Sequence, residues 1–341
     1  MKSLYERFIN NVFSFKHKKI VSTVDSQFNE IQLYPTIFAG NSHLFEVDQH
    51  CTKIISNTES KLQGSWKKFC ANDNFFVGLT VNNELYGCGL NTYGQLKADP
   101  VKYPKFETLT LILKDVQDVA IGEHHTLALV RNTTHNVVVG FGNNQQKQLS
   151  NTDQSHTYTP IVLAVAEHPF KPKIFAYGNN TGITYNYTSQ ILGENSFLQF
   201  SADNNKNIIQ GLELCSVGFN TFFFKDKGEN LYSCGDNSTY QLGVSTCSAI
   251  SHEKVFENKI PNMFKISTIH SGMYCTTVVD SRNNIYVWGR CADSNTYSTP
   301  TQILEDDEWY TAVVGDNFLA AINTDGYTYC IGSVTKQQDL E

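Results

Sequence analysis

Residues 84–96, ELYGCGLNTYGQL, and residues 231–243, LYSCGDNSTYQLG, follow one pattern. Each reads Leu-Tyr, any residue, Cys-Gly, any residue, Asn, and each continues to Gln-Leu at the same offset. Related stretches occur at 138–149, 190–200, 285–291 and 328–334, with an eroded copy at 53–62. Recurrence of one frame is the mark of a repeat architecture, so the stretch has to be interpreted as one copy of a repeat.

A second frame precedes every copy of the first. It begins with glycine, or with Asn72 in one copy, and runs into an apolar strand, at 40–47, 72–79, 122–129, 178–185, 218–225, 272–279 and 315–322. The two frames predict consecutive strands of a hairpin, because Asn82-Asn83, Lys227-Gly228, Asn283-Asn284 and Asp325-Gly326 between them suit tight turns. Three or four short strands in each of seven units predict an all-β, seven-bladed β-propeller. A linear solenoid is the alternative.

The repeats fill the chain, so residues 1–341 are interpreted as a single β-propeller domain. The units cover about 37–62, 70–96, 119–149, 174–200, 214–242, 268–297 and 312–340. Too few residues follow Gly332 to form an outer strand for the last unit. Residues 1–36 contain the strand-like stretches IVSTV and EIQLY. We therefore expect this N-terminal segment to supply the missing strand and close the ring.

Composition narrows the classes of function and location. A net charge of −7 argues against a general nucleic-acid surface, which needs clustered Lys and Arg. The nine cysteines lack CxxC spacing, so we expect no metal site and reduced thiols. No apolar run approaches the roughly 20 residues of a membrane-spanning helix. We expect a cytoplasmic monomer; a nuclear location and a mitochondrial presequence are the alternatives.

The glycines of the opening stretch have two interpretations. A phosphate-binding loop needs G-x-G-x-x-G at a junction between a strand and a helix. Here the third glycine is missing, no helical pattern follows, and the motif repeats. We therefore predict structural turns, in which glycines permit close backbone packing and the Asn and Gln side chains bind nearby backbone. The residues concerned are Gly89, Asn91, Gln95, Gly142, Gly235, Asn237 and Gly289.

The two frames resemble the repeats of the regulator of chromosome condensation (RCC-type) family of propellers. The likeness is carried by Gly122-Glu123-His124-His125-Thr126, by residues 85–91 and by Gly94-Gln95-Leu96, and it spans about 37–340. Ile55, Asn72 and Cys291 depart from the family pattern. The resemblance implies a propeller in which His43 and His125 form hydrogen bonds between blades.

The residue after the leading glycine differs from copy to copy and recurs on one face of a propeller. It is Asn41, Asp73, Glu123, Asn179, Phe219, Met273 and Asp316 in turn. Acids beside Phe and Met suit a protein-binding face, with charges that steer and apolar anchors. A solvated ring of loops without a partner is the alternative. In the family's Ran exchange factor an acid and a histidine on this rim contribute to nucleotide release; Asp73, Glu123, His124 and Asp316 match by type and position.

These observations predict a protein-interaction scaffold with no chemistry of its own, no catalytic residues and no cofactor. The alternative is guanine-nucleotide exchange on a small Ran-like GTPase, although the wedge insertion expected of the exchange factor is not recognisable. An enzyme has little support, since no nucleophile motif such as G-x-S-x-G is present.

Overall fold

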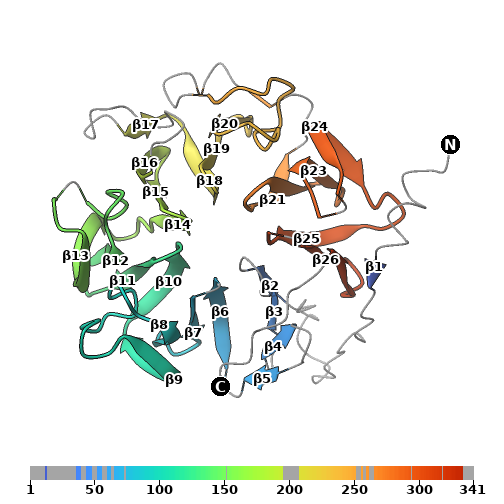
Figure 1. The fold of residues 1–341 in the computed structure, drawn as a ribbon. Coiled ribbons are helices and arrows are strands. Elements are labelled where there is room, and N and C mark those ends of the chain that lie inside the picture. The colour runs from blue at the N-terminus through green and yellow to red at the C-terminus, as the bar shows by residue number, and fades with distance from the viewer. Residues whose placement is uncertain are drawn as a thin grey trace, which may run out of the picture.

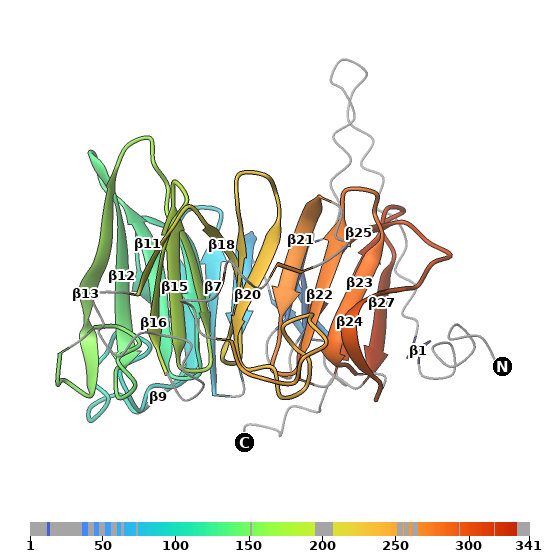
Figure 2. The same ribbon diagram turned by 90° about the horizontal axis from the view of Figure 1, so that it is seen from above.

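The computed structural model is a ring of β-sheets (Figure 1). It describes residues 12–13, 36–39, 44–47, 52–55, 60–62, 65–72, 74–150, 152–194, 207–250, 255, 259–260, 265–292, 294–316 and 318–332, with side chains from residue 65 onward. Turned by 90°, the strands run from one face of the ring to the other (Figure 2). The described elements are all strands apart from turns and a single residue of 3-10 geometry, so the all-β propeller prediction is confirmed.

The described strands form seven antiparallel sheets, each running outward from the centre. The first holds β2 (Thr36–Ala39), β3 (Leu44–Val47), β4 (Thr52–Ile55) and β5 (Ser60–Leu62). The second holds β6 (Trp66–Ala71), β7 (Phe75–Thr80), β8 (Leu85–Leu90) and β9 (Lys105–Leu113). The third holds β10 (Val116–Ile121), β11 (His125–Arg131), β12 (His135–Asn143) and β13 (His156–Glu167).

The fourth sheet holds β14 (Lys173–Tyr177), β15 (Asn180–Tyr185), β16 (Thr188–Gly193) and β17 (Ile208–Gln210). The fifth holds β18 (Glu213–Gly218), β19 (Thr221–Lys225) and β20 (Leu231–Gly235). The sixth holds β21 (Ile266–Ser271), β22 (Cys275–Asp280), β23 (Ile285–Arg290) and β24 (Thr296–Ile303). The last holds β25 (Trp309–Val314), β26 (Phe318–Asn323) and β27 (Thr328–Gly332).

The outer edge of the last sheet comes from the other end of the chain. β1 (Val12–Phe13) pairs with β27, with Val12 opposite Ile331 and Phe13 opposite Cys330. The ring is therefore closed by the N-terminal segment, as predicted. IVSTV and EIQLY, residues 20–24 and 30–34, both lie outside the described residues.

The core forms between neighbouring sheets, so the middle strands are buried on both sides. All six residues of β22 and of β26 are buried. One large cluster joins Phe223, Trp288 and Trp309, which come from three successive sheets. The outer strands are half-exposed instead: Val162 and Val165 on β13 are 62% and 52% exposed. The repeat frames were readable because these paired middle strands need the same apolar spacing in each copy.

The hairpin turns follow the predicted pairs with one exception. Asn83, Asn283 and Gly326 have φ of 63°, 64° and 85°. In the fifth sheet the positive φ falls on Glu229, at 62°, rather than within Lys227-Gly228. The Asp226 side chain accepts hydrogen bonds from the amides of residues 228 and 230, at 2.8 and 2.9 Å, and so shifts the turn by one residue.

One pair of cysteines contradicts the expectation of reduced thiols. Cys275, at the start of β22, forms a disulfide with Cys291, which follows β23. The antiparallel pairing of β22 with β23 brings their Cα atoms to 5.1 Å although they are 16 residues apart. Spacing along the chain did not reveal this contact, because only the register of the hairpin creates it. The other cysteines of the described residues are free.

Candidate functional site

The loops between the first and second strands of the sheets gather at one mouth of the ring. We call this set the loop ring; its described residues are 72, 74, 122–124, 178–179, 219–220, 272–274 and 315–316. They share a face because every first strand ends there and every second strand begins there. Five of the first strands, β6, β10, β14, β18 and β21, and Val313 of β25 line the channel below.

The structure places most of the predicted partner-binding residues on this ring. The Glu123 side chain is 46% exposed and that of His124 is 22% exposed. Asn179, Phe219, Met273 and Asp316 are half-buried. Asn41 and Asp73 lie outside the described residues. Five loops therefore present the variable position to one shared surface.

Neighbouring loops are tied to each other. The Asn72 amide donates to the Gly122 carbonyl at 2.7 Å, and the Glu123 backbone N–H donates to the Gly178 carbonyl at 2.7 Å. Farther round, the Phe219 N–H donates to the Gly272 carbonyl at 3.1 Å. Hydrogen bonds thus join several neighbouring loops, and these contacts hold the backbone from which the variable side chains project.

The leading glycine is required where these loops meet. A Cβ on Gly122 would lie 2.1 Å from His125 Cε1 and 2.4 Å from the Gly178 carbonyl oxygen. No side chain tolerates such contacts, so the glycine permits the loops of two sheets to touch. Directly below, His125 Nε2 lies 2.9 Å from Thr181 Oγ1 on the next sheet, the hydrogen bond between blades that the resemblance implied. Burial lowers the pKa of His125 to about 3.

A hydrogen bond crosses the mouth of the channel. Tyr177, at the end of β14, donates from its hydroxyl to Asp316 Oδ1 at 3.0 Å, although the two residues are 139 positions apart. They belong to the fourth and last sheets, on opposite sides of the ring (Figure 1). Tyr177 was not predicted as a site residue. The sequence did contain a signal, because Tyr177 is a large polar residue at a position directly before the leading glycine or Asn72. Five other sheets have smaller or apolar residues there: Ala71, Ile121, Val217, Ser271 and Val314.

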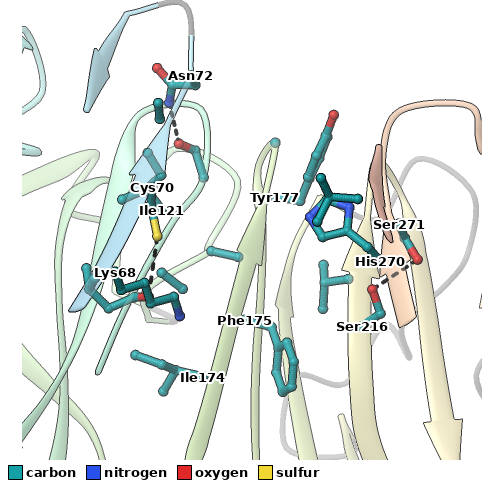
Figure 3. Close-up of a pocket in the computed structure, with 18 of the residues that line it drawn as sticks. Lys68, Cys70, Asn72, Ile121, Ile174, Phe175, Tyr177, Ser216, His270 and Ser271 are labelled. Carbon is teal, nitrogen blue, oxygen red and sulfur yellow. Dashed lines mark hydrogen bonds between the residues drawn. The ribbon is translucent and has the colours of Figure 1, made fainter. Parts of the chain in front are cut away.

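Below this bond lies a cavity of about 260 Å³. Figure 3 shows Lys68 and Cys70 on one wall, Ile174, Phe175 and Tyr177 in the middle, and His270 on the other wall. Lys68 Nζ contacts Asp118 Oδ1 at 2.8 Å. His270 Nδ1 accepts the Val314 N–H at 3.2 Å, which places the ring proton of neutral histidine on Nε2.

The titratable groups of the channel are held in unreactive forms. Burial raises the pKa of the Cys70 thiol to about 11, and burial lowers the pKa of His270 to about 4. A protonated thiol is a poor nucleophile. The described residues also contain no group of three or more His, Cys, Asp or Glu that could hold a metal ion. The described lining therefore combines the ion-paired Lys68 with a protonated thiol and a neutral imidazole.

Glu123 and His124 form the most polar point of the loop ring. His124 Nε2 lies 3.7 Å from Glu123 Oε1, and its ring packs on Tyr93 of the neighbouring sheet at 4.9 Å between centroids. Burial lowers the pKa of His124, which outweighs the opposing effect of Glu123. Glu123 is therefore a partly exposed carboxylate beside a neutral imidazole, an arrangement that can accept and donate hydrogen bonds to a partner.

The opening motif has a different role on the same face. Gly89 has φ of 107°, and a Cβ there would lie 2.6 Å from the Asn74 carbonyl oxygen. Asn91 is fully buried; it donates to the carbonyls of Ala98 and Tyr103 at 3.0 and 2.8 Å. Gln95 accepts the Tyr93 N–H at 2.9 Å. Asn91 and the Gln95 side-chain oxygen therefore hold the backbone of this turn rather than surround an anion site.

The other copies of this turn have the same geometry. Gly142, Gly235 and Gly289 have φ of 113°, 116° and 87°. Asn237 accepts the Leu242 N–H at 3.0 Å and donates to the carbonyls of Val244 and Thr246. These repeated residues therefore hydrogen-bond within the framework of the sheets.

Comparison with known proteins finds similarity to one kind of propeller. The model of the regulator of chromosome condensation (RCC1) repeat matches residues 66–95. The chain is 25% identical over 245 residues to the mouse serine/threonine-protein kinase Nek9, covering 67% of this chain but only 20% of that protein. Its structure is similar to Prp20p from Saccharomyces cerevisiae, with a TM-score of 0.67, 17% identity, 89% of this chain covered and 83% of that chain.

Human WBSCR16 is a further structural neighbour, with a TM-score of 0.64 and 14% identity over 81% of this chain and 79% of that chain. At 17% and 14% sequence identity, these two structures show that the fold is similar and nothing about a shared function. The matched repeat lies on β6, β7 and the turn after β8, the region that contains the opening motif. The chain therefore contains a match to the RCC1 repeat at residues 66–95, within a β-propeller whose fold is similar to that of Prp20p.

Proposed function

We propose that the loop ring binds a protein partner and that the chain acts as an interaction scaffold without chemistry of its own. One observation carries the proposal: the position that varies among the repeats projects from a hydrogen-bonded ring at one mouth of the propeller. A rigid frame with variable side chains suits specific recognition, because little conformational entropy is lost on binding.

Charge and shape at the ring fit this role. Glu123 supplies a partly exposed charge for steering, while the half-buried Phe219 and Met273 supply apolar surface close to the centre. The bond between Tyr177 and Asp316 spans the mouth, so a partner meets a bridged surface rather than an open hole. The similar propeller Prp20p binds Gsp1p and histones, so protein binding by such a propeller has a precedent.

The direct test is capture of a partner with purified full-length protein, followed by measurement of its affinity. Replacing Phe219 and Met273 together by Ser should weaken that affinity by about tenfold or more, as loss of central apolar contacts does. Val162→Ser is the matched control, because Val162 is 62% exposed on the outer strand β13, away from the ring. Equal affinity of all three proteins would overturn the proposal.

Guanine-nucleotide exchange on a small Ran-like GTPase is the second candidate. The pairing of Glu123 with neutral His124 favours it, because these residues match by type the exchange residues implied by the resemblance. Nucleotide release from a panel of small GTPases should accelerate with the wild-type protein, and Glu123→Ala should reduce the acceleration. Glu167→Ala, at an exposed acid on β13, is the control. If no GTPase shows accelerated release, the exchange function is excluded and the scaffold role is the one that remains.

A further inference from the structure

A second cavity of about 260 Å³ lies away from the loop ring. It is lined by Gln117, Arg131, Asn136, His168, Pro169 and Lys171. These residues come from the start of β10, the adjoining ends of β11 and β12 at their hairpin, and the connection from β13 to β14. All three segments lie at the strand ends opposite to those that form the loop ring. The cavity is therefore on the other face of the propeller.

The lining of this cavity is basic and contains no acid. Neither Arg131 nor Lys171 forms an ion pair with any described residue, whereas Lys68, Lys105, Lys114, Lys147, Lys173 and Lys225 each do. A third cation stands at the edge, where Lys67 Nζ donates to the Gln117 carbonyl at 3.1 Å. In a chain with a net charge of −7, this lining therefore carries positive charge without an acid of its own.

The two loops that carry these cations are held in place. Asn132 Oδ1 accepts the N–H groups of Thr134 and His135 at 2.9 and 2.7 Å, which fixes the β11–β12 turn. The buried Asn136 side chain donates to the Phe170 carbonyl at 2.7 Å and to His168 Nδ1 at 3.2 Å. The Arg131 and Lys171 backbones are thus positioned before any ligand arrives.

His168 forms a wall of the cavity rather than a contact for an anion. Its Nδ1 accepts from Asn136, and its Nε2 lies 3.3 Å from the Asn132 carbonyl, so both ring nitrogens are used within the protein. Three other lining residues carry side-chain donors: the Arg131 guanidinium, the Lys171 ammonium and the Gln117 amide.

We propose that this cavity binds a phosphate group. Arg131 would offer paired N–H donors to two phosphate oxygens, Lys171 a compact positive charge, and Gln117 a neutral donor. A phosphate carries more negative charge and more acceptor oxygens than a carboxylate, so it satisfies this set of donors better. Both cations are exposed at the surface, so binding should weaken as the salt concentration rises.

Titration of the full chain with inorganic phosphate at constant ionic strength, followed by amide chemical shifts, tests the proposal. We expect saturable shifts confined to residues 117, 131–136 and 168–171. Arg131→Gln and Lys171→Gln should each weaken binding by about tenfold, as expected for loss of one charge-assisted contact. Lys227→Gln is the matched control: it makes the same charge change on an exposed residue of the equivalent turn in the fifth sheet.

A parallel titration with phosphoserine and with serine identifies the source of the phosphate. Tighter binding of phosphoserine would assign the site to a phosphorylated side chain, and tighter binding of inorganic phosphate would assign it to the free ion. Binding of serine or acetate as strong as that of phosphate would overturn the proposal. So would shifts that fail to saturate, or equal binding by Arg131→Gln, Arg131→Lys and wild type with unchanged thermal unfolding.

Discussion

Two kinds of connection meet on one face of the propeller and differ in almost every property. The turn after the third strand, exemplified by Gly89 to Leu96, is nearly the same in several sheets, and its Asn and Gln side chains are buried. The loop after the first strand differs from sheet to sheet and exposes Glu123. Leu90 N–H donates to the Asn74 carbonyl at 2.8 Å, so the two kinds of connection touch.

This difference suggests two roles: the repeated turns stabilise the fold, and the loop ring is the surface that we propose for recognition. Where copies agree, the buried Asn side chains hydrogen-bond to the backbone of their own turn. Where they disagree, the backbone is fixed by its neighbours and the side chain is free to vary. Substitutions in the turns should therefore reduce stability, and substitutions in the loop ring should change binding with little effect on stability.

The largest effect is expected from Gly89→Val. A β-branched residue is strained at φ of 107°, and its Cβ would lie 2.6 Å from the Asn74 carbonyl oxygen. The free energy of unfolding should fall by about 4 kcal/mol, measured by urea denaturation. Gly211→Ala is the control: Gly211 has φ of 83° but no atom within 4 Å of its Cβ, so only about 1 kcal/mol should be lost. Equal losses would show that crowding is not the cause.

Asn91→Ala should come next. The substitution leaves the Leu96 N–H and the carbonyls of Ala98 and Tyr103 without their partner in a buried turn. Loss of about 3 kcal/mol is expected from the unfolding midpoint, because buried polar groups without partners are costly. Glu123→Ala on the loop ring should lose less than about 0.5 kcal/mol. If Glu123→Ala lowered the free energy of unfolding more than Asn91→Ala, the loop ring rather than the turn would be the structural element.

Acidification should destabilise the fold, because histidines behind the loop ring are buried in the neutral form. The pKa of His125 is lowered to about 3, so the folded protein excludes a proton that the unfolded chain binds below about pH 6.5. The stabilising effect is therefore complete above pH 6.5 and declines as the pH falls. Between pH 6.5 and 5 the decline should be roughly 2 kcal/mol from this residue. His125→Gln should reduce the pH dependence measured by denaturation, leaving the part due to His270; an unchanged slope would contradict the burial of His125.

A smaller effect is expected at the bond across the channel. Tyr177→Phe and Asp316→Ala each remove one partner of this bond and should each lower the free energy of unfolding by about 1 kcal/mol. The double variant should lose less than the sum of the two, because both substitutions act on one hydrogen bond. Strictly additive losses in the double-mutant cycle would mean that the bond contributes nothing.

Much of the architecture could be predicted because each sheet has to solve the same packing problem. The paired frames marked the middle strands, and β1 from the N-terminal segment closes the ring by pairing with β27. Contacts that depend on position in three dimensions could not be read in the same way. Cys275 and Cys291 meet through one hairpin register, and Tyr177 reaches Asp316 only because the ring closes.

The candidate sites show the same division. The variable position of the second frame predicted which residues would gather at one mouth, because the repeat places them equivalently in each sheet. The basic cavity escaped prediction, since Gln117, Arg131 and Lys171 belong to three segments with no shared pattern.

The most direct test of the central claim is the affinity of one captured partner for three proteins: wild type, the Phe219→Ser/Met273→Ser variant and Asn91→Ala, under conditions where all three are folded. Recognition by the loop ring predicts a loss of about tenfold or more for the double variant and unchanged affinity for Asn91→Ala. Unchanged affinity of the double variant, with a loss for Asn91→Ala, would place recognition in the repeated turns and contradict the account.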